Sequence, residues 1–175
     1  MKLLAYAATY HSKSINRALV TYAASLVPDA EVEVLDLNDF SLPLYTQDVE
    51  ARDGIPEAAR RFYDRIGAAD AVAISFAEHN GSYTAAYKNL YDWASRIDSK
   101  VFQGKPVVIM AASPGPRGGK GVLGAAEMSL PFFGAELKGS VSVPRFHNVF
   151  DREAGRLTDA EPDEALRALM ATLTP

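Results

Sequence analysis

The amino-acid sequence predicts an α/β fold, in which one parallel β-sheet carries helices on both faces. Two observations lead to this prediction. Short apolar or alternating segments, typical of strands, alternate along the chain with longer segments whose apolar residues recur at helical spacing. The chain has 175 residues, which suits a single domain over residues 1–175 with one substantial core.

Five strands are expected, and their sequences differ according to their place in the sheet. Residues 2–7 and 70–76 are continuous apolar runs, typical of parallel strands buried on both faces. Residues 31–37 alternate acidic and apolar side chains, which favours a strand nearer the edge of the sheet. The remaining strands are expected at residues 106–112 and 139–143.

The helices expected between these strands follow from apolar residues spaced three and four apart. Pro56 suits the start of the second helix, whereas Pro131 is expected to kink or shorten the end of the fourth. The helices cover about residues 14–27, 56–66, 83–97, 121–133 and 166–173.

The composition excludes several classes of function. The formal net charge of −4 gives no reason to expect nucleic acid or an anionic membrane as a partner. The absence of cysteine excludes disulfides, thiol catalysis and thiolate metal sites. No run approaches the roughly 18 apolar residues of a membrane helix, and the first residues lack the features of a signal peptide, so a cytoplasmic location is expected. No metal is expected either, because the histidines are scattered without the spacing of metal ligands: His11, His79 and His147.

The segment after the first strand, residues 8–16, is rich in hydrogen-bonding groups and leads into a helix. Thr9, Ser12, Ser14 and Asn16 supply hydroxyl and amide groups, and the start of the helix supplies free backbone N–H groups. Together these groups suit a phosphate dianion. The alternative is that Ser12 or Ser14 only caps the helix.

The strand at residues 70–76 ends in a turn that contains Asn80 and Gly81. An Asn-Gly pair turns the backbone sharply, and Gly81 lets a flat ligand approach the main chain. The neighbouring Glu78 and His79 are adjacent in sequence and point in different directions, which argues against an acid–base pair. An ordinary strand-to-helix turn is the alternative.

A glycine-rich segment, residues 113–121, follows the fourth strand. It is not a Walker loop, because Pro114 and Gly121 stand where that motif needs a glycine and a serine or threonine. Its glycines allow a close approach of the backbone, and a mobile turn without a ligand is the alternative. The three segments follow three parallel strands whose carboxyl ends converge, so one shared ligand site is expected there.

These segments resemble the NADPH-dependent FMN reductase family, the flavodoxin-like quinone, azo and chromate reductases. The first family motif, approximately G-S-x-R-x-x-S-x-N, aligns with residues 8–16, with His11 where arginine is usual. The second, P-E-Y-N-G-S followed by K-N-x-x-D-W, aligns with residues 77–82 and 88–93, with Ala77 and His79 in place of proline and tyrosine. The third, S-x-G-x-x-G-G, is intact from Ser113 to Gly119.

The resemblance implies a flavodoxin-like three-layer fold with a five-stranded parallel sheet in the order 2-1-3-4-5. It also implies FMN as cofactor, with the phosphate in the first segment and the ring against the second and third. The residues expected to bind the cofactor are Thr9, His11, Ser14, Ile15, Asn16, Ala77, Glu78, His79, Asn80, Gly81, Ser113, Gly115, Gly118 and Gly119.

The activity implied by the resemblance is that of an NAD(P)H-dependent oxidoreductase. NADPH, or NADH, passes hydride to flavin N5, and a quinone or similar small acceptor then takes the electrons in a ping-pong mechanism. No catalytic side chain is expected, because the chemistry takes place on the flavin. The alternative is a flavodoxin-type electron carrier, which fits less well because such proteins are strongly acidic and sandwich the ring between aromatic residues. A phosphate-accepting signalling domain is excluded, because the strand ends at residues 7–9 and 76–77 lack carboxylates.

A homodimer or homotetramer is also expected. On the helix at residues 83–97, one apolar stripe should face the sheet: Ala86, Leu90, Trp93, Ala94 and Ile97. Tyr83, Tyr87 and Tyr91 form a second stripe, which indicates a partner surface. The alternative is that these tyrosines lie flat on the domain with their hydroxyl groups in water. Family members are usually dimers or tetramers, and this favours the oligomer.

Tyr45 and Asp48 are expected to border the acceptor pocket.

Overall fold

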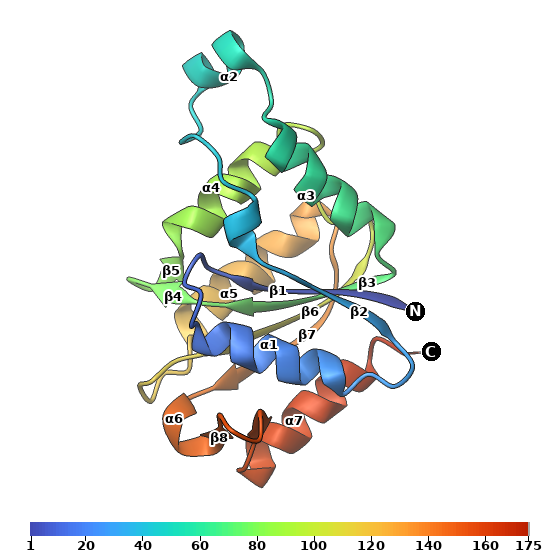
Figure 1. Cartoon of the computed structure of the whole chain (residues 1–175), viewed down its shortest axis with the longest axis vertical. Helices are drawn as coiled ribbons and strands as arrows, with labels where there is room; N and C mark the ends of the chain where they lie inside the picture. Colours follow the sequence, from blue (N-terminus) through green and yellow to red (C-terminus); the bar gives the residue numbers. More distant parts are fainter. Residues whose placement is uncertain (175) are drawn as a thin grey trace.

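The computed structural model describes residues 1–174 and is built around a five-stranded parallel sheet (Figure 1). Its strands lie in the order β2-β1-β3-β6-β7, which in chain order is 2-1-3-4-5, so the predicted topology is confirmed. The strands are β1 (Lys2–Ala8), β2 (Glu31–Leu35), β3 (Ala71–Phe76), β6 (Pro106–Ala112) and β7 (Glu136–Val143).

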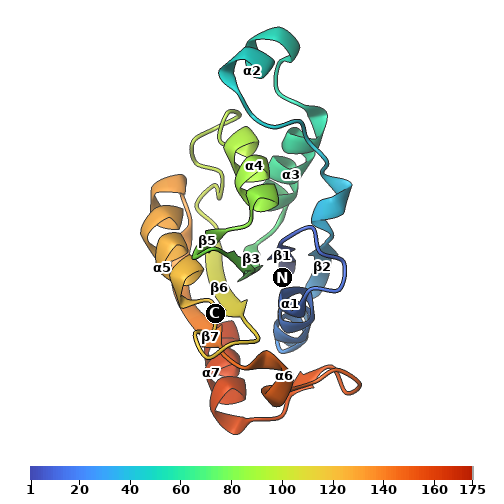
Figure 2. The same cartoon turned by 90° about the vertical axis from the view of Figure 1, so that its left-hand side faces the viewer.

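Helices cover both faces of the sheet, as Figures 1 and 2 show. Helices α1 (Ile15–Ser25) and α7 (Ala160–Ala171) bury Leu19 and Leu166 against one face. The opposite face is covered by α3 (Glu57–Ala68), α4 (Ala85–Ala94) and α5 (Lys120–Ser129). β3 contains no exposed residue, as expected for a central parallel strand, whereas β2 is an edge strand with exposed acidic residues.

Prolines and capping side chains mark the ends of several helices. Pro56 is the N-cap residue of α3, and α5 ends at Ser129, after which Pro131 lies in a short 3₁₀ helix, η2 (Leu130–Phe133). Ser14, Thr84 and Asp159 each accept a hydrogen bond from a backbone N–H in the first turn of the helix that follows.

Several short elements were not predicted, because each is too short to show a period. They are η1 (Leu37–Asp39), α2 (Gln47–Asp53), α6 (Phe146–Val149), and the hairpins β4–β5 (Glu78–His79, Ser82–Tyr83) and β8–β9 (Phe150–Asp151, Arg156–Leu157). Helix α2 has no buried residue and projects from the body in both views (Figures 1 and 2). Across the part of the chain that the structure describes, no helix combines the length and apolar character needed to cross a membrane.

The tyrosine stripe on α4 is not a partner surface, so that prediction is wrong. Tyr87 and Tyr91 are only 1% and 5% exposed, and Tyr83 is half-buried. The Tyr87 ring stacks on Tyr91 at 5.7 Å between centroids, and Phe133 covers Tyr91 at 5.0 Å. Of the other stripe, Leu90, Trp93 and Ala94 are fully buried, whereas Ala86 and Ile97 are only partly buried.

The alternative interpretation, with the tyrosine hydroxyls in water, also fails for the two buried rings. The hydroxyl groups of Tyr6, Tyr87 and Tyr91 are buried without a hydrogen-bond partner within residues 1–174. Burial raises the pKa of all three phenols, so they stay neutral. Packing of aromatic surface, rather than hydrogen bonding, therefore holds this part of the core together.

Candidate functional site

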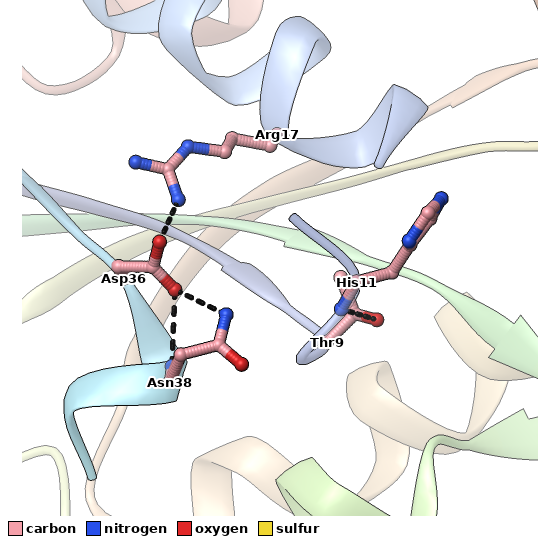
Figure 3. Close-up of polar contacts among 5 residues, drawn as sticks. All are labelled: Thr9, His11, Arg17, Asp36 and Asn38. Carbon is pink, nitrogen blue, oxygen red and sulfur yellow. Dashed lines mark hydrogen bonds and ion pairs between the residues drawn. The ribbon is translucent and has the colours of Figure 1, made fainter. Parts of the chain in front are cut away.

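The loop between β1 and α1 presents backbone N–H groups at the carboxyl edge of the sheet. The N–H of His11 binds the Thr9 hydroxyl oxygen at 3.2 Å, and the N–H of Asn16 binds the Ser14 hydroxyl oxygen at 3.1 Å (Figure 3 shows the first of these). The N–H groups of Ser12, Lys13 and Ile15 have no hydrogen-bond partner among the described residues. Both hydroxyls accept through oxygen and keep their protons free to donate, so the loop is a set of donors suited to an anion.

Asn16 belongs to this loop in sequence, but its side chain points into the protein and is only 3% exposed. Its Oδ1 accepts from the Ser75 hydroxyl and from the Ala112 N–H, each at 2.8 Å, and its Nδ2 donates to the Ala112 carbonyl at 3.2 Å. The amide therefore joins the start of α1 to the ends of β3 and β6. The sequence contains a signal for this role, because Asn16 occupies the buried stripe of α1 with Leu19, Val20 and Ala23.

On the other side of the first loop, Arg17 and Asp36 brace α1 against the end of β2 (Figure 3). Asp36 also accepts from the backbone N–H of Asn38 at 3.0 Å and from its side-chain amide at 2.7 Å. The backbone hydrogen bond from Asn38, together with the Asn38 amide and the Arg17 guanidinium, lowers the pKa of Asp36. This carboxylate is fully engaged by the protein, so it serves the fold.

The second loop is a two-residue hairpin between β4 and β5. Asn80 and Gly81 have φ values of 53° and 81°, as a tight primed turn requires, and a side chain at position 81 would meet nothing within 4 Å. The Glu78 carboxylate accepts from the Val122 N–H at 2.8 Å and so caps the first turn of α5. Glu78 therefore links the second loop to α5, consistent with the argument against an acid–base pair with His79.

In the third loop, two glycines are required by packing. A Cβ on Gly118 would overlap the Ser142 hydroxyl and lie 2.9 Å from the Pro144 nitrogen, and a Cβ on Gly119 would lie 2.6 Å from the Cβ of Ala111. Both have positive φ, 59° and 73°. Gly115 has neither constraint, since a Cβ there meets nothing within 4 Å. The N–H groups of Gly115, Gly118 and Gly119 have no partner within the described chain, so this loop also presents donors.

The three loops line one cleft of about 410 Å³. Of the residues predicted to bind a cofactor, those on the cleft wall are Thr9, His11, Ser14, Ile15, Asn16, Ala77, Glu78, His79 and Ser113. Asn80, Gly81, Gly115, Gly118 and Gly119 do not line it. The wall also contains residues that the sequence analysis did not assign to a cofactor: Lys13, Ala112, Pro114, His147 and Arg152. The histidines, scattered in sequence, all face this cleft.

The second half of the second motif has a structural role some distance from the cleft. The Asn89 amide and the Trp93 indole N–H both donate to the Pro43 carbonyl, at 3.0 and 2.8 Å, and Asn89 Oδ1 accepts from the Tyr45 N–H at 2.8 Å. The Tyr45 ring packs edge-on against Trp93, and its hydroxyl donates to Glu50. These contacts clamp the segment from Pro43 to Thr46, hereafter the strap, onto α4. Tyr45 and Asp48 do not line the cleft.

Comparison with known proteins agrees with this geometry. A family model described as NADPH-dependent FMN reductase matches residues 1–148. An NAD(P)H-dependent FMN reductase of Pseudomonas aeruginosa is 34% identical over 176 aligned positions, which cover 99% of this chain and 93% of the relative. A quinone reductase of Pseudomonas putida is 37% identical over 122 positions, which cover 69% of this chain and 64% of the relative.

Among solved structures, the flavoenzyme NAD(P)H:acceptor oxidoreductase FerB of Paracoccus denitrificans superposes with a TM-score of 0.80. It is 26% identical, and the superposition covers 98% of this chain and 94% of FerB. The family match spans β1 to α6 and includes all three loops of the cleft. The chain therefore belongs to the NADPH-dependent FMN reductase family.

Proposed function

We propose that the cleft holds FMN, with the phosphate at the first loop and the isoalloxazine ring against the second and third. The observation that carries this proposal is the convergence of the three loops on one cleft of about 410 Å³, with the free N–H donors of the first loop at its wall. The unpaired N–H groups of Ser12, Lys13 and Ile15 and the hydroxyls of Thr9 and Ser14 suit a phosphate dianion. The start of helix α1 contributes roughly 0.3–1 kcal/mol to such binding, and charge-assisted hydrogen bonds add to it.

When bound, FMN supplies the chemistry of accepting hydride from NADPH or NADH and passing the electrons to a quinone or similar small acceptor. The residues of the chain bind and orient it. The third loop meets the cleft at Ser113 and Pro114, so this is the part of the loop that would lie against the ring. A nicotinamide must come within about 3–3.5 Å of the ring to pass hydride to it.

The composition of the cleft favours an enzyme over an electron carrier. Over residues 1–174, no phenylalanine, tyrosine or tryptophan lines the cleft, whereas a flavodoxin-type carrier sandwiches the ring between such residues. An open ring face suits a mechanism in which two substrates use the same site in turn, because the oxidised nucleotide must leave before the acceptor enters. The proposal therefore includes ping-pong kinetics.

Anaerobic stopped flow tests this function. NADPH alone is expected to bleach the flavin of the FMN-loaded protein within the turnover time, and a quinone is expected to restore its colour. Steady-state rates should then give parallel double-reciprocal lines. A bound flavin that NADPH and NADH reduce only over hours would identify the chain as an electron carrier. Cofactor identity is tested separately, since FMN must bind more tightly than riboflavin if the first loop holds a phosphate.

We also propose that the chain forms a homodimer or homotetramer, on evidence other than the tyrosine stripe. Leu44, Met128 and Phe132 are 75%, 74% and 77% exposed, which is unusual for large apolar side chains. Leu44 lies in the strap on α4, and Phe132 precedes Phe133, which packs on Tyr91 of the same helix. Leu44 and Phe132 therefore give the molecule exposed apolar side chains beside α4, which a second copy would cover. A cytoplasmic location, expected from the sequence, is part of the proposal, and fractionation of cells that express the chain tests it.

A further inference from the structure

Arg152 lies on the wall of the cleft but comes from a part of the chain outside the three loops. It is in the hairpin β8–β9, beyond the residues that the family model matches. It lines the cleft together with Lys13 and Ser14 of the first loop, and it shares the same two neighbours in an adjoining groove. Two adjoining cavities thus place Arg152 beside the loop whose N–H groups are unpaired.

The hairpin that carries Arg152 is held firmly to the body of the protein. Phe150 is buried, stacks on Phe146 at 4.5 Å and meets the edge of Tyr22 on α1 at 6.2 Å. The N–H of Phe146 in turn donates to the Ser113 carbonyl of the third loop at 3.0 Å. The hairpin is therefore tied to two of the elements that form the cleft, and this fixes the position of its tip.

The charge of Arg152 is not used elsewhere in the protein. Its side chain is exposed, and within residues 1–174 no carboxylate forms an ion pair with it. By contrast, Arg17 on the same side of α1 is paired with Asp36. The other ionisable groups on the cleft wall are His11, Lys13, Glu78, His79 and His147, and the Glu78 carboxylate is committed to α5. An exposed arginine that forms no ion pair within the described chain and lines the same cleft as a loop of anion donors is well suited to a phosphate.

We propose that Arg152 is a phosphate-binding residue of the FMN site and replaces the arginine that is usual at position 11. His11 lacks the guanidinium fork with which arginine binds a phosphate through two parallel hydrogen bonds. Arg152 supplies that fork from the hairpin β8–β9, beside the first loop. This inference rests on the proposed function, since the phosphate that it binds is that of FMN.

Calorimetric titration of the purified full chain with FMN and with riboflavin tests the proposal. Arg152→Ala is expected to weaken FMN binding about tenfold, because one charge-assisted contact to the phosphate is lost, and to change riboflavin binding by less than about twofold. Arg152→Lys keeps the charge without the fork and should fall between wild type and alanine. Arg156→Ala is the matched control, because Arg156 lies on the same hairpin and does not line the cleft.

The decisive variant adds His11→Arg to Arg152→Ala. If a guanidinium at position 11 binds the phosphate as the one at position 152 does, this double variant recovers the FMN affinity of the wild type. Unchanged FMN affinity in Arg152→Ala, or an equal loss for riboflavin, would overturn the proposal while leaving the FMN site in place. A wild-type chain that binds both flavins equally would overturn the phosphate site as a whole and this role of Arg152 with it. The melting temperature of each variant is measured as well, and a value equal to that of the wild type shows that the loss of FMN affinity does not come from unfolding.

Discussion

At the scale of single residues, Asn16 does most to define the geometry of the cleft. Its amide makes three buried hydrogen bonds to Ser75 and Ala112, so the ends of β3 and β6 are held at fixed distances from the first loop. Sequence analysis recognised the residue but assigned it to the cofactor. The loop motif reads the same whether the asparagine amide faces a ligand or the core. Only the position of Asn16 on the buried stripe of α1 indicates that its amide faces the core.

Asn16→Ala is expected to lower the free energy of unfolding by about 2–3 kcal/mol, because it leaves the Ser75 hydroxyl and both backbone groups of Ala112 buried without partners. Urea denaturation measures this loss. Ser12→Ala is the control in the same loop, since the Ser12 side chain makes no hydrogen bond to residues 1–174, and it should be neutral within about 0.5 kcal/mol. Equal stability of the two variants would contradict the bracing role.

At the scale of elements, the start of α5 depends on glycine for a reason that the motif does not reveal. The S-x-G-x-x-G-G pattern predicts close approach of a ligand to all three glycines, but Gly118 and Gly119 are approached by β7 and β6 of the protein itself. The tyrosine stripe of α4 misled the sequence analysis similarly. The stripe is covered by Phe133, which lies far along the chain, and periodicity within one helix carries no information about that contact.

The glycines of the third loop can be separated by function. Gly118→Ala is expected to lower the free energy of unfolding by at least about 1–2 kcal/mol, because it adds an overlap with Ser142 to a positive φ. Gly115→Ala should leave stability within about 0.5 kcal/mol of wild type, because its Cβ would meet nothing. If the flavin ring lies against this loop, Gly115→Ala should nevertheless weaken FMN binding. Denaturation and titration of the same two variants measure both effects, and similar stability of the two would contradict this assignment of roles.

At the scale of the whole molecule, the sequence was sufficient for the topology and for the general location of the site. Alternating strands and helices fix a parallel sheet, and the carboxyl ends of parallel strands must converge. The same rule could not place the hairpin β8–β9 beside the first loop. That placement depends on Phe146 and Phe150 packing toward α1, a contact between segments at opposite ends of the chain.

The exposed apolar residues around α4 lead to a prediction about assembly. Light scattering at micromolar concentration is expected to give the mass of a dimer or tetramer of the 18.9 kDa chain. Phe132→Glu, at a position 77% exposed in the single chain, should shift the mass toward the monomer without unfolding it. Val32→Glu is the control, because Val32 is also exposed but lies on the edge strand β2. A monomeric wild-type chain would contradict the proposal.

The clamp on the strap also gives the molecule a natural optical probe. Trp93 is the single tryptophan of the chain, is fully buried, and donates its indole N–H to the Pro43 carbonyl. Its emission comes from one position and depends on whether the strap is docked. Asn89→Ala removes the other hydrogen bond to Pro43, so it should move the emission to longer wavelength as water reaches the indole. Movements of the strap and of the adjoining helix α2 can therefore be followed in real time, without a label, in the wild-type protein.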